Sequence, residues 1–241
     1  MDVMRTGCSM LGNLEPETDF DQQHEAADRL LAALPAIICY WYRYSHDGVR
    51  INTDTGEATL GGHFLKMLLD ETPSDAHRAV MNCSLILYAE HEFNASTFTA
   101  RVCAATLSDM YSCITGAIGS LRGPLHGGAN EAAMELIEKF NTPDAVEAQI
   151  LGMLERKEVI MGFGHAIYRT SDPRNAIIKE WSDKLADETE TARSMTFLAQ
   201  SPMRCGTLRN YSLMPTSSML RHTTTWVFPR KFSHQFSLCR A

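Results

Sequence analysis

Apolar residues recur every three or four positions along most of the chain before residue 190, which is the spacing of one face of an α-helix. The pattern is clearest over 21–45, where Pro35 predicts a kink or a restart of the helix. The alternation that marks a half-buried strand does not occur before residue 190. We therefore expect an all-α fold. Further helices are predicted from about 61, over 74–90, 96–118, 130–140 and 142–157, and from 172.

Capping residues mark several of these helix starts. Ser74 is a plausible N-cap for the 74–90 helix. Thr142 followed by Pro143, and Asp172 followed by Pro173, each place a capping side chain before a proline at the first helical position. These signals indicate short helices joined by polar loops.

Composition narrows the class of protein. A chain of 241 residues with 44% hydrophobic residues and a net charge of −7 is typical of a globular protein and gives no reason to expect nucleic acid as a partner. It shows no N-terminal signal pattern and no apolar run of about 18 residues. Its seven cysteines form no CxxC pairs, which argues against a disulfide framework or a zinc ribbon. We expect a cytoplasmic protein without a membrane partner.

One histidine lies in a loop of three glycines and a proline, Gly123–Asn130, between two apolar helical segments. Glycine allows positive φ and close approach of a ligand, and proline ends the preceding helix. A titratable ring at such a junction suits acid–base chemistry. A helix–helix turn with a solvated His126 accounts for this octapeptide equally well.

Three more residues stand beside predicted helix ends. His165 follows a second glycine-rich segment at 162–164, and His91 lies in a polar cluster between two apolar segments. Arg174 lies in the first turn of a helix, where its charge opposes the helix dipole, and a bound carboxylate would offset that cost. No histidine follows His91 at the spacing of a zinc helix, and no P-loop, GxGxxG or GxSxG motif is present. The set indicates polarisation of a substrate oxygen and proton transfer without a metal.

Two segments carry a family resemblance. Residues 123–131, Gly-Pro-Leu-His-Gly-Gly-Ala-Asn-Glu, and residues 162–174, which run from Gly-Phe-Gly-His-Ala to Asp-Pro-Arg, resemble the two central motifs of the citrate synthase family. Residues 1–7, 40–46 and 90–98 are similar to its 2-methylcitrate synthase branch. The resemblance covers residues 1 to about 200 and implies a multi-helical citrate-synthase-like fold.

The resemblance also implies a reaction. The family joins an acyl-CoA, here propionyl-CoA or acetyl-CoA, to oxaloacetate and hydrolyses the thioester without a metal or a further cofactor. By motif match, His126 would hold the thioester oxygen as the enol forms, and His165 would polarise and protonate the oxaloacetate carbonyl. His91 and Arg174 would bind oxaloacetate and its product. The residues implied to lie against coenzyme A are Gly162, Phe163 and Gly164. A homodimer is also implied.

The chain departs from the family at both ends. The family counterpart of residues 1–7 lies inside longer chains, so we expect several N-terminal helices to be missing. The resemblance stops near Ser201, and the region beyond it should carry the aspartate that removes the acyl α-proton. All 29 acidic residues lie at or before Glu190, whereas seven of the 22 basic residues lie after it. We expect a partial helical domain or domains over 1–200 and a basic tail over 201–241, irregular or disordered.

Two functional outcomes follow from these departures. The chain is either a fragment of an acyl-CoA condensing enzyme with impaired or no activity, or a non-catalytic remnant that serves as a helix-packing module.

A change of reading frame near 195–202 would explain the tail. When the codons of Thr225–Arg240 are read displaced by one nucleotide, synonymous choices permit Met-Gly-Ile-Pro-Thr-Lys-Val-Phe-Thr-Pro-Ile-Phe-Val-Met-Ser-Arg. This peptide resembles the family's sequence for this region. The same shift over Asn210–Thr216 permits Lys-Leu-Phe-Pro-Asn-Ala-Asp, which ends in the expected aspartate.

The coding DNA tests this hypothesis. We expect the displaced frame to read as these peptides without a stop codon, because agreement over so many codons would otherwise be accidental. An independent isolate with an intact frame and this same tail would refute it.

Overall fold

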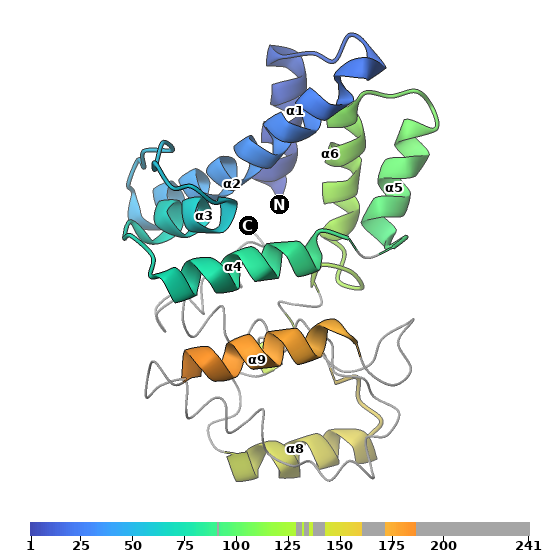
Figure 1. Cartoon of the computed structure of the whole chain (residues 1–241). Coiled ribbons are helices and arrows are strands. Elements are labelled where there is room, and N and C mark those ends of the chain that lie inside the picture. Colours follow the sequence, from blue (N-terminus) through green and yellow to red (C-terminus); the bar gives the residue numbers. More distant parts are fainter. Residues whose placement is uncertain (91, 129–131, 133–134, 137–142, 161–171, 187–241) are drawn as a thin grey trace. The chain divides into compact units, whose positions relative to one another are not determined.

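The computed structural model describes residues 1–90, 92–128, 132, 135–136, 143–160 and 172–186, and it divides into a first unit, Met1–Gly127, and a second unit, Gly128–Ala241. The described elements are all helical, as predicted (Figure 1). Within the described ranges, no helix is long and apolar enough to cross a membrane. The helices of the first unit are α1 (Asp2–Leu14), a 3₁₀ turn η1 (Phe20–Gln22), α2 (Gln23–Asp47), α3 (Leu60–Leu69), α4 (Asp75–Tyr88), α5 (Ala95–Ala104) and α6 (Met110–Leu121). Those of the second unit are α8 (Pro143–Glu155) and α9 (Arg174–Ala186).

The core of the first unit lies where α1, α2 and α6 meet. Its buried members are Cys8, Ala26, Leu30, Tyr111 and Ile118. Tyr111 is 1% exposed, and burial of so large a side chain contributes strongly to the hydrophobic stabilisation of the unit. Its hydroxyl accepts a hydrogen bond from Arg29 Nη1 at 2.7 Å, so the polar end of the ring is satisfied. Figure 1 shows α6 between α1 and α5.

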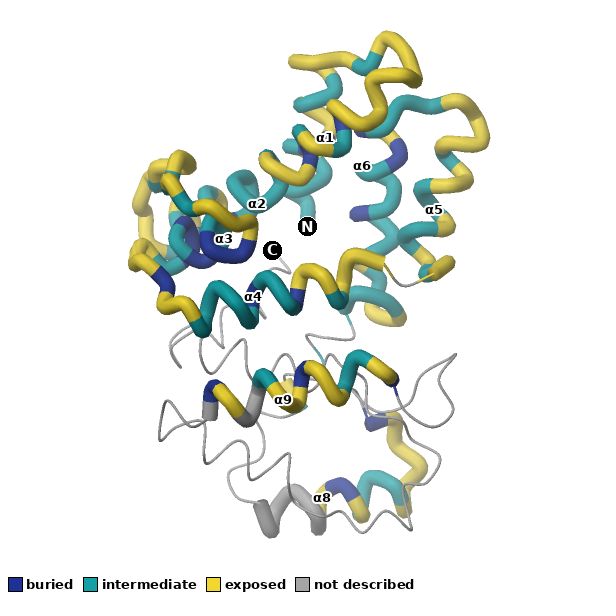
Figure 2. The backbone as a smooth tube through the Cα atoms, viewed as in Figure 1, coloured by how far each residue is buried: buried dark blue, intermediate teal, exposed yellow. Residues whose placement is uncertain are grey.

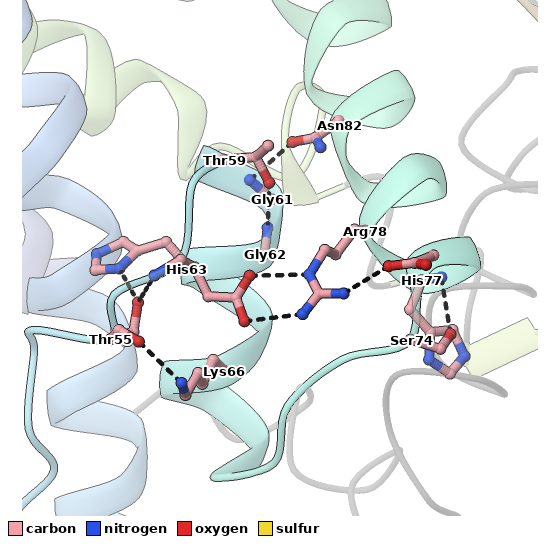
Figure 3. A network of polar contacts seen from close by, with 12 residues as sticks. Thr55, Thr59, Gly61, Gly62, His63, Lys66, Ser74, His77, Arg78 and Asn82 are labelled. Atoms are coloured by element: carbon pink, nitrogen blue, oxygen red, sulfur yellow. Dashed lines mark hydrogen bonds and ion pairs between the residues drawn. The ribbon is translucent and has the colours of Figure 1, made fainter.

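Helix α3 is the most deeply buried helix of this unit, whereas α5 has no buried residue (Figure 2). A polar network joins the start of α3 to α4 (Figure 3). Glu57 accepts from Arg78 Nε at 2.9 Å and from Arg78 Nη2 at 3.0 Å, and Lys66 Nζ donates to the Thr55 carbonyl at 2.8 Å. Thr59 caps α3 by accepting from the Gly62 amide at 3.1 Å. These contacts hold the loop before α3 against both helices.

In the second unit, the described core is small. Ile150 of α8 and Ile160 are buried together, with Leu136, Met153 and Leu154 packed against them. Pro143 is the first residue of α8, as its fixed φ predicts. The expected tail over 201–241 lies outside the described residues.

Several expectations about helix boundaries differ from the structure. The helix predicted over 96–118 is two helices, α5 and α6, because Asp109 caps a new helix by accepting from the Ser112 amide at 2.9 Å. The cap of α5 is Asn94 rather than Ser96 or Thr97. Of the two outcomes predicted at Pro35, the restart does not occur, because α2 is one helix that continues through Pro35 to Asp47.

No helix is predicted before residue 21, but Asp2–Leu14 form helix α1. Met4, Cys8 and Leu11 lie on its face toward the core at helical spacing. The glycines and polar residues between them make this spacing hard to recognise in the sequence. Tertiary packing therefore decides the structure here rather than local propensity.

Gly61 gives a sharp test of packing between α3 and α4. A Cβ there would lie 2.6 Å from Asn82 Oδ1 and 2.9 Å from the Asn82 amide nitrogen, and the latter is backbone that cannot move alone. We expect Gly61→Ala to lower the free energy of unfolding by about 1–3 kcal/mol, measured by urea denaturation. Gly119→Ala is the matched control, because a Cβ at that helical glycine meets nothing nearer than 3.9 Å. Equal stabilities for the two variants would contradict this packing.

Candidate functional site

The loop after α6 holds the first predicted site residue, His126. The chain leaves the helix through two tight turns, in which the Gly123 amide donates to the Ser120 carbonyl at 3.1 Å and the His126 amide donates to the Gly123 carbonyl at 2.9 Å. Gly127 lies so close to α6 that a Cβ there would be 2.5 Å from the Leu121 carbonyl oxygen. A side chain at 127 is therefore excluded, and the loop stays folded against the end of the helix.

The imidazole of His126 is half-buried and contacts the start of α5. Its Nε2 lies 2.9 Å from Ser96 Oγ and 3.3 Å from the Ser96 amide nitrogen. Ser96 Oγ also lies 2.7 Å from Asn94 Oδ1, the oxygen that caps α5 by accepting from the Thr97 amide at 3.0 Å. The solvated-turn interpretation of His126 is therefore wrong, because the ring has fixed partners from another helix.

Two proton arrangements fit this geometry. With the proton on Nδ1, Nε2 accepts from the Ser96 amide, and the Ser96 hydroxyl donates its one proton either to Nε2 or to Asn94 Oδ1. With the proton on Nε2, the ring donates to Ser96 Oγ, and the hydroxyl donates to Asn94 Oδ1. Only the first arrangement satisfies the Ser96 amide, and it leaves Nδ1–H as a donor for an oxygen of a ligand.

Arg174, the first residue of α9, is held by a protein carboxylate. Its Nε and Nη2 lie 3.0 and 2.7 Å from the two oxygens of Asp172, whose side chain is 1% exposed. Asp172 also accepts from the Arg174 amide at 2.9 Å, so its side chain bonds the helix start as predicted, although α9 begins at Arg174 rather than at Pro173. A buried carboxylate with a charge-assisted pair of bonds fixes the guanidinium plane.

The ion pair with Asp172 explains how a guanidinium is tolerated at the start of a helix without a bound carboxylate ligand. Asp172 already supplies negative charge at the helix start and offsets the unfavourable position of the guanidinium. A role for Arg174 in substrate binding therefore rests on the motif and stays a prediction.

The other predicted site residues lie outside the described residues. They are His91, Gly162, Phe163, Gly164 and His165. His126 and Arg174 belong to different units of the chain.

The described part of the chain offers no support for metal-dependent chemistry or for a cysteine nucleophile among its buried thiols. No group of three or more potential ligands there could hold a metal ion. Cys8, Cys39 and Cys113 are buried free thiols, and burial raises the pKa of each, that of Cys39 to about 12. These thiols stay protonated at neutral pH and are poor nucleophiles.

Sequence reasoning missed Ser96 as a partner of His126. A serine at a helix start indicates a cap, and nothing local links it to a histidine 30 residues later. Asp172 was likewise assigned only to the helix start. The arginine two residues after Asp172 is visible in the sequence and could have suggested this ion pair.

The family is established by comparison. Residues 1–204 match the family described as citrate synthase, C-terminal domain, and the chain belongs to the citrate synthase family. It is 72% identical over 186 residues to the 2-methylcitrate synthase of Shewanella oneidensis, an alignment that covers 77% of this chain and 50% of that protein. It is 44% identical over 194 residues to citrate synthase 2 of Bacillus subtilis, which covers 78% of this chain and 51% of that protein. The chain spans about half the length of the curated relatives it matches.

Solved structures share the fold. The citrate synthase of Thermotoga maritima superposes with a TM-score of 0.76 at 31% identity, covering 96% of this chain and 61% of that one. The citrate synthase of Thermoplasma acidophilum, in a ternary complex with carboxymethyl coenzyme A and oxaloacetate, gives a TM-score of 0.77 at 26% identity, covering 94% and 61%. The expected citrate-synthase-like fold is confirmed.

The Ser96 contact predicts a specific effect on His126. We expect Ser96→Ala to shift the ring ¹⁵N and Cε1–H resonances of His126, because the ring loses its hydroxyl partner. Ser112→Ala is the control, since Ser112 Oγ bonds the N-cap Asp109 of α6 at 2.6 Å as Ser96 Oγ bonds Asn94. His126 resonances that respond equally to the two variants, or to neither, would refute the contact.

Proposed function

We propose that this chain carries part of the active site of an acyl-CoA condensing enzyme that joins propionyl-CoA to oxaloacetate and hydrolyses the thioester with water, releasing 2-methylcitrate and coenzyme A. The observation that carries the proposal is the half-buried imidazole of His126, whose Nε2 contacts both the amide and the hydroxyl of Ser96, in a family motif. The 72% identity to a 2-methylcitrate synthase supports propionyl-CoA over acetyl-CoA. One methylene changes binding by only about 1–3 kcal/mol, so acetyl-CoA is the expected second substrate.

In this proposal, His126 acts on the thioester. The Ser96 amide donates to Nε2 and so leaves the ring proton on Nδ1, and Nδ1–H donates to the thioester oxygen and stabilises the negative charge that develops as the enol forms. A donor fixed before reaction costs no reorganisation at the transition state. His165 polarises the oxaloacetate carbonyl and protonates its oxygen as the carbon–carbon bond forms.

The oxaloacetate carboxylates are bound by His91 and Arg174. Asp172 orients the Arg174 guanidinium, and its buried position excludes water from one edge of that group. We propose that coenzyme A binds along the segment Gly162–Gly164. The two glycines allow the ligand to approach the backbone closely, and the flat ring of Phe163 can pack against it. The ternary complex of the Thermoplasma acidophilum relative supports these two ligands.

The proposal includes a homodimer and a cytoplasmic location. Helix α5 exposes apolar side chains, with Phe98 61% and Val102 52% exposed, and an apolar face of this kind suits contact with a second copy. The unpaired pattern of cysteines suits a reducing compartment.

The acyl α-proton needs a base that this chain lacks in the expected region, because no acidic residue follows Glu190. Removal of that proton is the step we expect to limit turnover. The same absence favours a second candidate, a non-catalytic remnant that keeps the family's packing surfaces.

Restoring the displaced frame after residue 201 tests the proposal. We expect the 241-residue chain to release thiol from propionyl-CoA and oxaloacetate slowly or not at all, and the restored chain to release it much faster. General acid–base groups contribute about 10²–10⁴-fold, which sets the size of the gain.

His126→Ala in the restored chain should remove most of this gain, whereas His24→Ala, a histidine outside the motifs, should not. No thiol release from the restored chain would favour the non-catalytic remnant. Normal turnover by the 241-residue chain would contradict the inference that it lacks the base that removes the acyl α-proton.

A further inference from the structure

The end of α6 is tied to the start of α1 by a long-range ion pair. Arg122, the residue that ends α6, places Nη1 2.6 Å from Asp2 Oδ1 and 2.8 Å from Asp2 Oδ2. Asp2 is the first residue of α1, so the contact joins residues 120 positions apart. Arg122 directly precedes the loop that carries His126.

A second cation completes the cluster. Arg5 Nη2 bonds the same carboxylate from the next turn of α1. A Cβ at Gly119 would lie 3.9 Å from Arg5 Cδ and Nη1, so Arg5 extends along α6 where that helix has no side chain. Burial by itself would raise the pKa of Asp2, but the guanidinium groups of Arg122 and Arg5 outweigh it and hold that pKa below its ordinary value.

The loop has little freedom of its own. Its first tight turn begins at Ser120 and its second at Gly123, and Gly127 lies against the Leu121 carbonyl. The orientation of the last turn of α6 therefore determines the position of His126, whose Nε2 lies within hydrogen-bonding distance of Ser96. A shift of 1 Å at a positioned group can cost about 100-fold in rate.

We propose that Asp2 is a positioning residue for His126, acting through Arg122 at the end of α6. The inference rests on the proposed role of His126 in catalysis. Asp2 and Arg122 are 46% and 43% exposed, so the pair adds little to overall stability. Its effect is local, because one carboxylate bridges two cations and fixes the helix end beside the loop.

The Ser96 amide gives a direct readout. The first amides of a helix have no partner within the helix, and the Ser96 amide donates to His126 Nε2. We expect Asp2→Asn to accelerate hydrogen exchange at the Ser96 amide and within 123–127 by about two- to fivefold, the range that follows from a surface ion pair. Asp2→Glu should retain most of the protection.

Asp75→Asn is the matched control. Asp75 is also the first residue of a helix, α4, and also pairs with an arginine three residues on, Arg78. Its partner Arg78 also binds Glu57 in the loop before α3, so the variant should disturb that region and leave exchange at Ser96 unchanged. Equal acceleration in the two variants, or none in Asp2→Asn, would overturn the inference.

Helix dipoles offer a competing explanation, because Asp2 lies at a helix start and Arg122 at a helix end. A double-mutant cycle separates the two. We expect Asp2→Asn, Arg122→Gln and the double variant to show nearly the same exchange rates at Ser96. Additive effects would assign the protection to the dipoles and overturn the inference. Exchange needs no turnover, so it judges the role of Asp2 separately from the proposed function.

Discussion

The burial of Tyr111 fixes helix α6, and the proposed site depends on that helix. The ring is enclosed by α1 and α2, and its hydroxyl is bonded by Arg29. Tight packing of this kind passes a displacement on to its neighbours rather than absorbing it. Because α6 is held along its length, the loop at its end presents His126 to the start of α5 in one arrangement.

Both described parts of the candidate site use a protein group to fix a side chain proposed to meet substrate. Ser96 orients the ring of His126, and Asp172 orients the guanidinium of Arg174. In each pair the orienting group belongs to a helix start, where capping already fixes the backbone. Preorganisation of this kind lowers the cost of reaching the transition state and requires no large movement of the residues involved.

The sequence predicted the helical class and the caps at Ser74 and Asp172, because these depend on local spacing and local hydrogen bonds. It did not predict the break between α5 and α6, since apolar spacing continues across it and only the cap at Asp109 marks the new helix. It also did not predict the contact of Ser96 with His126, which exists only once α5 and α6 pack together. His126 was proposed as a site residue because its glycine-rich loop is a local signal.

Before any turnover, the chain must bind oxaloacetate through Arg174. Isothermal titration of the chain with oxaloacetate measures this directly. The account predicts saturable binding that Arg174→Ala abolishes and that Lys184→Ala, which removes another cation of α9, leaves intact. Absence of binding, or binding that is unchanged in Arg174→Ala, would contradict it.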